Sequence, residues 1–67
     1  MEEIKRQYYN NRNIQKETHY INGKLHRLNG PAIIWYNKDG DIGIEEYYKN
    51  DKQHREDGPA KINYYEN

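Results

Sequence analysis

The stretch that decides the fold is His26-Arg27-Leu28-Asn29-Gly30-Pro31-Ala32, because it returns 28 positions later as His54-Arg55-Glu56-Asp57-Gly58-Pro59-Ala60. Recurrence at a fixed period of about 20–50 residues is the sequence signature of a repeat architecture. The match extends beyond these segments in both directions, through the pairs Tyr20–Tyr48, Asn22–Asn50, Lys24–Lys52, Ile34–Ile62 and Tyr36–Tyr64. We therefore divide residues 1–67, taken as one domain, into a partial unit (4–20), a full unit (21–48) and a second partial unit (49–67).

Alternating side chains predict strands within each unit. Ala32, Ile34 and Tyr36 are spaced by two residues, as are their counterparts 28 positions later, and this spacing puts side chains on one face of a sheet. Asp39-Gly40 is a strong hairpin signal, and in the equivalent turn, 10–13, we expect an Asn to adopt positive φ. The expected fold is all-β, a single antiparallel meander of about five strands, at 4–9, 14–21, 32–37, 42–49 and 60–65. Short paired segments are expected at 24–25 and 52–53, and residues 2–7 could instead form one helical turn.

The composition is that of a small folded domain rich in tyrosine. The 67 residues include only eight Ile and two Leu, with no Val or Phe, but eight Tyr and one Trp supply apolar area, and the net charge is zero. Without cysteine the chain has no disulfide, and small secreted domains usually depend on disulfides, so we expect a cytoplasmic protein. No apolar run approaches the roughly 18 residues of a membrane span, and the N-terminal residues lack the apolar core of a signal peptide.

The repeated segment resembles the MORN-like repeat variant. In that pattern a tyrosine precedes a short turn, often Asn-Gly-Lys, and then His-Arg-x-Asp-Gly-Pro-Ala; residues 20–32 and 48–60 follow it. Asn29 and Asp51 depart from the pattern, and the first unit lacks the His-Arg segment. Such repeats occur in bacterial antitoxin-like proteins and in viral proteins. The resemblance implies a binding or scaffold surface and supplies no catalytic residue.

The two His-Arg pairs are candidate anion-binding residues. His26, Arg27, His54 and Arg55 could form a row of donors for a phosphate, a nucleotide or an acidic protein surface, because arginine binds carboxylate and phosphate in a bidentate fork. The alternative is structural: each His would cap its own loop, and each Arg would pack its stem on a tyrosine. The presence of the pair in both complete loops favours the structural interpretation.

A difference between the two units marks a candidate partner-binding surface. Ile33 and Trp35 lie opposite the Ala-Ile-Tyr face, where the third unit has Lys61 and Asn63. Exposed large apolar residues mark contact surfaces, and Trp and Tyr are frequent interface anchors. Tyr9, Tyr47 and Tyr65 are expected on or near the same face, where they would complete an aromatic strip. Alternatively, both faces are covered at the centre of the sheet and Trp35 is packed inside.

The residue inventory argues against most catalysis. The chain has no Cys or Ser, and its three His residues do not follow the spacing of a metal motif, so we expect no catalytic residue, no metal and no cofactor. Eleven basic residues are balanced by eleven acidic residues, whereas generic binding to nucleic acid requires a basic face, so nucleic acid is not the expected partner.

These observations predict a non-enzymatic protein-binding module. Asn, Ile, Tyr and Lys, whose codons are AT-rich, make up 32 of the 67 residues. This composition and the small size suit a phage-encoded inhibitor that occludes a bacterial defence protein. Exposed sheet edges invite pairing, so we also expect a homodimer. The alternatives are a small-ligand sponge that binds a nucleotide and an antitoxin-like or structural repeat protein.

Overall fold

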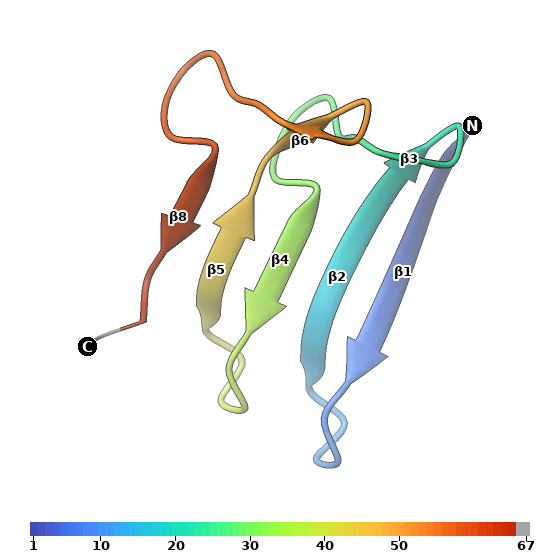
Figure 1. Cartoon of the computed structure of the whole chain (residues 1–67). Coiled ribbons are helices and arrows are strands. Elements are labelled where there is room, and N and C mark those ends of the chain that lie inside the picture. The colour runs from blue at the N-terminus through green and yellow to red at the C-terminus, as the bar shows by residue number, and fades with distance from the viewer. Residues whose placement is uncertain (66–67) are drawn as a thin grey trace.

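The computed structural model describes residues 1–65, and within them every regular element is a β-strand. The strands are β1 (Glu2–Tyr8), β2 (Ile14–Ile21), β3 (Lys24–Leu25), β4 (Ile33–Tyr36), β5 (Ile42–Glu46), β6 (Tyr48–Lys49), β7 (Lys52–Gln53) and β8 (Lys61–Asn63). Five of them form an antiparallel sheet in the order β1-β2-β4-β5-β8 (Figure 1), with β3 paired to β2, and β6 pairs with β7 separately. The expected fold class, an all-β antiparallel sheet of about five main strands, is confirmed.

The pairing registers recur at the spacing seen in the sequence. In the first hairpin Arg6 lies opposite Glu17, and 28 residues later Ile34 lies opposite Glu45. Each hairpin has its irregularity at the same relative position, before Tyr8 and before Tyr36. The β5–β8 pairing repeats the β2–β4 pairing 28 residues later, since Lys16 lies opposite Trp35 and Ile44 lies opposite Asn63. The strands therefore follow the alternation read from the sequence.

Three local expectations were wrong. Residues 2–7 form a strand rather than a helical turn, because they pair with β2 along their whole length. The strand expected at 42–49 is divided at Tyr47, whose N–H donates to Ala60 O at 2.7 Å while its carbonyl accepts from His54 N at 2.9 Å, so the chain changes partners there. In the turn at 10–13, the residue with positive φ is Arg12 (72°), the counterpart of Gly40 (93°), rather than an asparagine.

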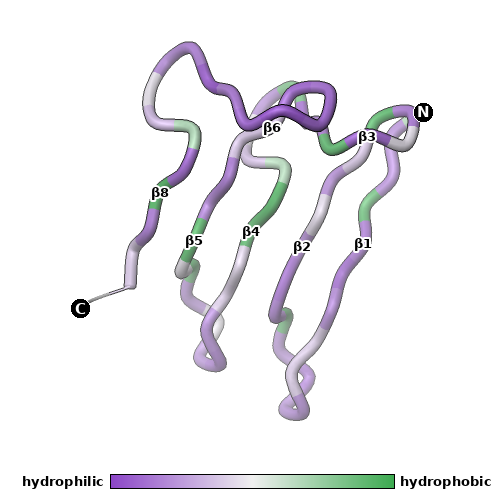
Figure 2. Tube along the Cα trace, in the orientation of Figure 1, coloured by the Kyte–Doolittle hydropathy of each residue, from purple (hydrophilic) through white to green (hydrophobic). Residues whose placement is uncertain are grey.

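The core is small and lies at the centre of the sheet. Its buried hydrophobic residues are Ala32, Ile33 and Ile34, with Thr18 and His19 of β2 buried beside them. Ile33 and Ile34 point to opposite faces, so both faces are covered at this point, although the molecule is only 15 Å thick in its shortest dimension. Figure 2 shows the apolar run on β4 among mostly hydrophilic segments. Within residues 1–65 no helix has the length and hydropathy needed to cross a membrane.

Each end of the sheet joins neighbouring units by polar contacts. At the hairpin ends, Tyr9 Oη donates to Tyr36 O at 2.6 Å and Asn13 Nδ2 donates to Lys38 O at 2.8 Å. At the opposite end, Asp51 accepts a bond from Leu25 N at 2.7 Å through its side chain. A glycine, as found at the equivalent position 23, has no side chain for this bond, which explains why Asp51 departs from the Asn-Gly turn.

Candidate binding cleft

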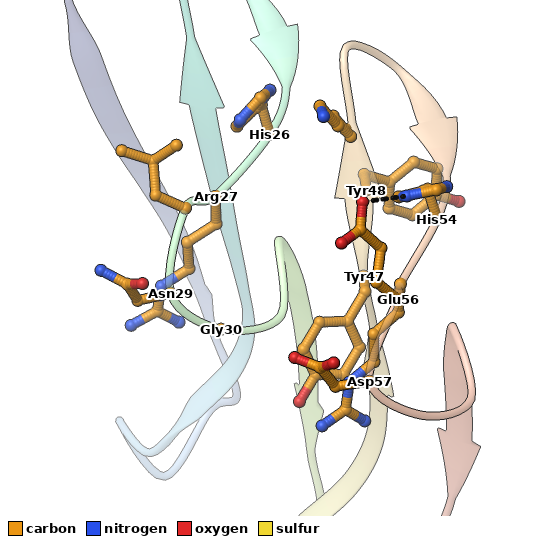
Figure 3. A pocket seen from close by; sticks show the side chains of 12 residues that line it. His26, Arg27, Asn29, Gly30, Tyr47, Tyr48, His54, Glu56 and Asp57 are labelled. Carbon is orange, nitrogen blue, oxygen red and sulfur yellow. Dashed lines mark ion pairs between the residues drawn. The ribbon is translucent and has the colours of Figure 1, made fainter.

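A cleft of about 570 Å³ lies between two loops that we call the return loops, residues 26–31 and 54–59. The loops lead from the small strands β3 and β7 back to the main sheet, and each ends in Gly-Pro just before an alanine. All four residues of the two His-Arg pairs line the cleft (Figure 3). The other lining residues come from the same loops and from the Tyr47–Lys49 segment between them: Leu28, Asn29, Gly30, Tyr47, Tyr48, Lys49, Glu56 and Asp57.

Each arginine braces its own loop. Arg27 Nη1 donates to Pro31 O at 3.2 Å, and Arg55 Nη1 donates to Pro59 O at 3.3 Å. The two glycines leave room for this arrangement, because a Cβ at Gly30 or Gly58 would lie 3.2 Å from the guanidinium. Arg55 also lies over the ring of Tyr47, with 4.0 Å between the guanidinium carbon and the ring centre. A guanidinium carries five N–H donors, so one bond to a proline carbonyl leaves further donors to face the cleft.

The two histidines differ in their contacts. His26 Nδ1 accepts a hydrogen bond from Asn50 N at 3.2 Å, which ties the first return loop to the turn of the following unit. The expectation that each histidine caps its own loop is therefore wrong for His26. His54 Nε2 lies 3.7 Å from Glu56 Oε1, within its own loop, and about half of its side chain is exposed.

Charge and apolarity are distributed unevenly across the cleft. The first return loop contributes Leu28, which is 75% exposed, and Asn29, whereas the second has Glu56 and Asp57 at those positions. Lys49, Arg27 and Arg55 are the lysine and arginine residues that line the cleft. Leu28 and Arg27 therefore lie on the first return loop, Arg55 lies with the two carboxylates on the second, and the lysine and arginine residues of the cleft outnumber its carboxylates by three to two.

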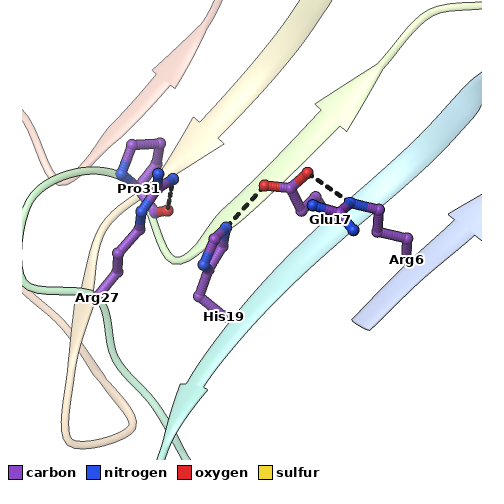
Figure 4. Close-up of polar contacts among 5 residues, drawn as sticks. All are labelled: Arg6, Glu17, His19, Arg27 and Pro31. Atoms are coloured by element: carbon purple, nitrogen blue, oxygen red, sulfur yellow. Dashed lines mark hydrogen bonds and ion pairs between the residues drawn. The ribbon is translucent and has the colours of Figure 1, made fainter. Parts of the chain in front are cut away.

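On β2, two polar contacts hold the side chain of Glu17 in place. Its carboxylate lies 2.7 Å from Nε2 of the buried His19 and accepts a 3.0 Å bond from Arg6 Nε (Figure 4). Burial alone would raise the pKa of Glu17, but the bonds from His19 and Arg6 outweigh it and lower the pKa below its ordinary 4.5.

The equivalent carboxylate in the next unit is Glu45, which accepts a 2.7 Å bond from Tyr64 Oη. This bond raises the pKa of the Tyr64 hydroxyl above its ordinary 10.0, because the neutral phenol is the donor. The carboxylate is kept at this position in both units, but its partners differ.

The five residues expected to form an aromatic strip do not lie together. Ile33 is buried, and Trp35 lies half-buried on the sheet under Lys16, 4.5 Å from the ammonium to the ring centre, while its indole donates to Glu46. Tyr47 lies in the cleft beneath Arg55. Tyr9 lines a smaller cleft of about 410 Å³ beside the 10–13 turn, and the ring of Tyr65 lies against Gly43.

Sequence reasoning missed Leu28, Tyr48 and Lys49 as lining residues. The signal for Leu28 was available, since an apolar residue there replaces the Glu56 of the next unit. Tyr48 was read only as a strand residue, and its place in the cleft depends on the division of the strand at Tyr47.

Among the described residues no group of three or more His, Asp or Glu side chains is placed to hold a metal ion. The chain matches no family model, no curated protein and no solved structure in the comparisons with known proteins.

Proposed function

We propose that this chain is a non-enzymatic binding module that holds an acidic segment of a partner protein in the cleft between its return loops. The observation that carries the proposal is the convergence of Arg27, Arg55 and Lys49 on one open cleft, where they outnumber the two carboxylates and lie beside the exposed Leu28. Arginine recognises carboxylates through paired donors, and an apolar residue beside the charges supplies desolvated contact area.

The hydrogen bonds made by the return loops support recognition. Each arginine is held by a proline carbonyl, and His26 ties the first loop to Asn50. Donors that are fixed before binding lose less conformational entropy when the partner arrives. In this proposal the module acts by covering a partner's surface, as an inhibitor encoded by a phage would act on a defence protein.

The test is a binding titration with Asp/Glu-rich peptides, followed by NMR of the backbone amides. The expected shifts fall on residues 26–31, 47–49 and 54–59. Leu28→Glu and Lys49→Glu should weaken binding about tenfold each, which corresponds to about 1.4 kcal/mol. Lys38→Glu is the matched control, because Lys38 lies in the 37–40 turn outside the residues that line the cleft. Shifts confined to the opposite end of the sheet would contradict the proposal.

A second candidate function is the binding of a nucleotide in the same cleft. The observation that favours it is that Tyr47 and Tyr48 line the cleft together with the cationic residues, since aromatic rings stack on bases while arginine holds phosphate. Thermal unfolding with a panel of linear and cyclic nucleotides tests it, because a ligand that binds only the folded state raises the Tm. A rise in Tm with nucleotides and no shift with acidic peptides would favour this candidate over the first.

A further inference from the structure

The outer edge of β1 is the longest strand edge left open in the described sheet. All seven residues of β1 are exposed, and Ile4 retains 42% of its accessible surface. The other end of the main sheet is β8, which has three residues. An open edge presents a row of backbone donors and acceptors to any strand that can match it.

The alternation of backbone hydrogen bonds along β1 identifies the residues whose N–H and C=O groups point to the open edge. Met1 O accepts from Asn22 N at 3.0 Å, so the odd-numbered residues at the start of the strand bond to β2. Because bonding direction alternates along an antiparallel strand, the N–H and C=O groups of Glu2, Ile4 and Arg6 point to the open edge.

The charges on this edge are arranged antisymmetrically about Ile4. The strand begins Glu2-Glu3-Ile4-Lys5-Arg6. If a second copy pairs with it antiparallel about a two-fold axis through Ile4, Glu2 lies opposite Arg6 of the other copy and Glu3 opposite its Lys5. Every charged residue of β1 then faces the opposite charge, and directly opposed pairs of this kind stabilise a sheet.

Neighbouring two-fold registers are disfavoured by the same charges. An axis through Lys5 sets two lysines against each other, and an axis through Glu3 sets two glutamates against each other, which destabilises the pairing. An axis through Ile62, the centre of β8, pairs Lys61 with Asn63 and gains no opposite charges. The pattern therefore selects one edge and one register.

We propose that two copies of this chain form a dimer by antiparallel pairing of their β1 strands, centred on Ile4. The paired strands join the two sheets into one continuous sheet. Arg6 keeps its Nε bond to Glu17, which occupies one of its five donors. The proposal does not depend on the cleft, which is lined by other residues.

Sedimentation equilibrium and charge swaps test the dimer. We expect a mass twice the 8.2 kDa of the chain. Glu3→Lys sets a lysine against Lys5 of the other copy, and Lys5→Glu sets a glutamate against Glu3 of the other copy, so each variant should dissociate at least tenfold more readily than the wild type. An equimolar mixture of the two variants restores opposite charges at both positions and should recover the dimer. A wild-type chain that stays monomeric up to about 1 mM, or a mixture no tighter than either variant alone, would overturn the proposal.

Two further variants test the register and the bonding. The chain has no native cysteine, so Ile4→Cys gives one thiol per copy, at a Cα separation of about 5.5 Å in a bonded pair, within disulfide range. Glu2→Cys is the matched control, because positions 2 of the two copies are about 13 Å apart along the strands in this register. Cross-linking should be fast for Ile4→Cys alone.

Ile4→Pro removes an outward N–H without breaking the β1–β2 ladder, which an edge strand tolerates. It should give a folded monomer, as judged by circular dichroism. Equal cross-linking of both cysteine variants, a dimer that persists in Ile4→Pro, or open-ended assembly through β8 would refute the pairing. Lys49→Glu in the cleft should leave the dimer unchanged, so failure here is distinguishable from failure of the binding proposal.

Discussion

Glu17 Oε1 lies 2.7 Å from Nε2 of His19, a histidine that retains only 4% of its accessible surface. The pair sits in the middle of β2, next to the small apolar core of β4. A buried polar group without a partner is costly, so this contact, rather than a large hydrophobic interior, secures the centre of the sheet.

The lowered pKa of Glu17 predicts acid-sensitive stability. A carboxyl group whose pKa is lower in the folded state stabilises the fold above its unfolded pKa, here 4.5, and this contribution is lost as the pH falls through the folded value. In the wild type, we expect the urea concentration at the midpoint of unfolding to decrease when the pH is lowered below 4.5. Glu17→Gln should be less stable than the wild type near neutrality, but its stability should decrease less on acidification. Asp39→Asn, in an exposed turn, is the control. An equally steep acid dependence in Glu17→Gln would show that other groups dominate.

Arg55 should contribute to stability independently of any partner. It donates to Pro59 O and lies over Tyr47, and exposed contacts of these kinds are each worth about 1 kcal/mol or less. Arg55→Ala should therefore lower the free energy of unfolding by about 1 kcal/mol, and Arg55→Lys by less, because lysine keeps the charge but loses the planar stacking. Urea denaturation followed by circular dichroism measures both. A stability equal to wild type in Arg55→Ala would contradict the bracing role.

The alternation of Ala, Ile and Tyr was sufficient to predict the main strands, because the period of two survives in both units. The division at Tyr47 could not be predicted, since it depends on where β7 returns in space. The counterpart region of β2 stays continuous because β1 pairs along all of it, whereas β4 begins only after Pro31, which has no N–H to donate.

The four His-Arg residues line one cleft, and their anion-binding role stays a prediction. The aromatic strip failed because side chains alternate along β5: Glu46 lies on the face of Trp35, with which it bonds, so the next residue, Tyr47, projects to the other face. Trp35 is covered by the long side chain of Lys16, whose position no periodicity reveals.

The hairpin turns predict a stabilising substitution. Arg12 has φ of 72° and Gly40, its counterpart, 93°, and this region costs an L-residue other than glycine about 1–2 kcal/mol. Arg12→Gly should therefore raise the free energy of unfolding by up to about 1 kcal/mol, the remainder being offset by the flexibility of glycine in the unfolded chain. Gly40→Ala, where an added Cβ would meet no atom within 4 Å, should destabilise through backbone strain alone. Thermal unfolding of both variants checks the signs, and a lower Tm for Arg12→Gly would contradict the argument.

Substitutions of Trp35 and Leu28 should distinguish a residue that stabilises the fold from a residue that contacts the partner. Trp35 is half-buried between Lys16 and Glu46, so Trp35→Ala removes packing and should cost about 2 kcal/mol, below the roughly 3–5 kcal/mol typical of fully buried aromatics. Leu28 is 75% exposed, so Leu28→Ala should change the free energy of unfolding by less than about 0.5 kcal/mol.

If the cleft is the binding surface, the two substitutions have the opposite order of effect on the affinity for an acidic partner. Leu28→Ala then weakens binding, and Trp35→Ala does not when the titration is carried out under conditions in which this variant is folded. Urea unfolding gives the first comparison and isothermal titration the second. Loss of binding in Trp35→Ala alone would move the binding surface from the cleft to the sheet.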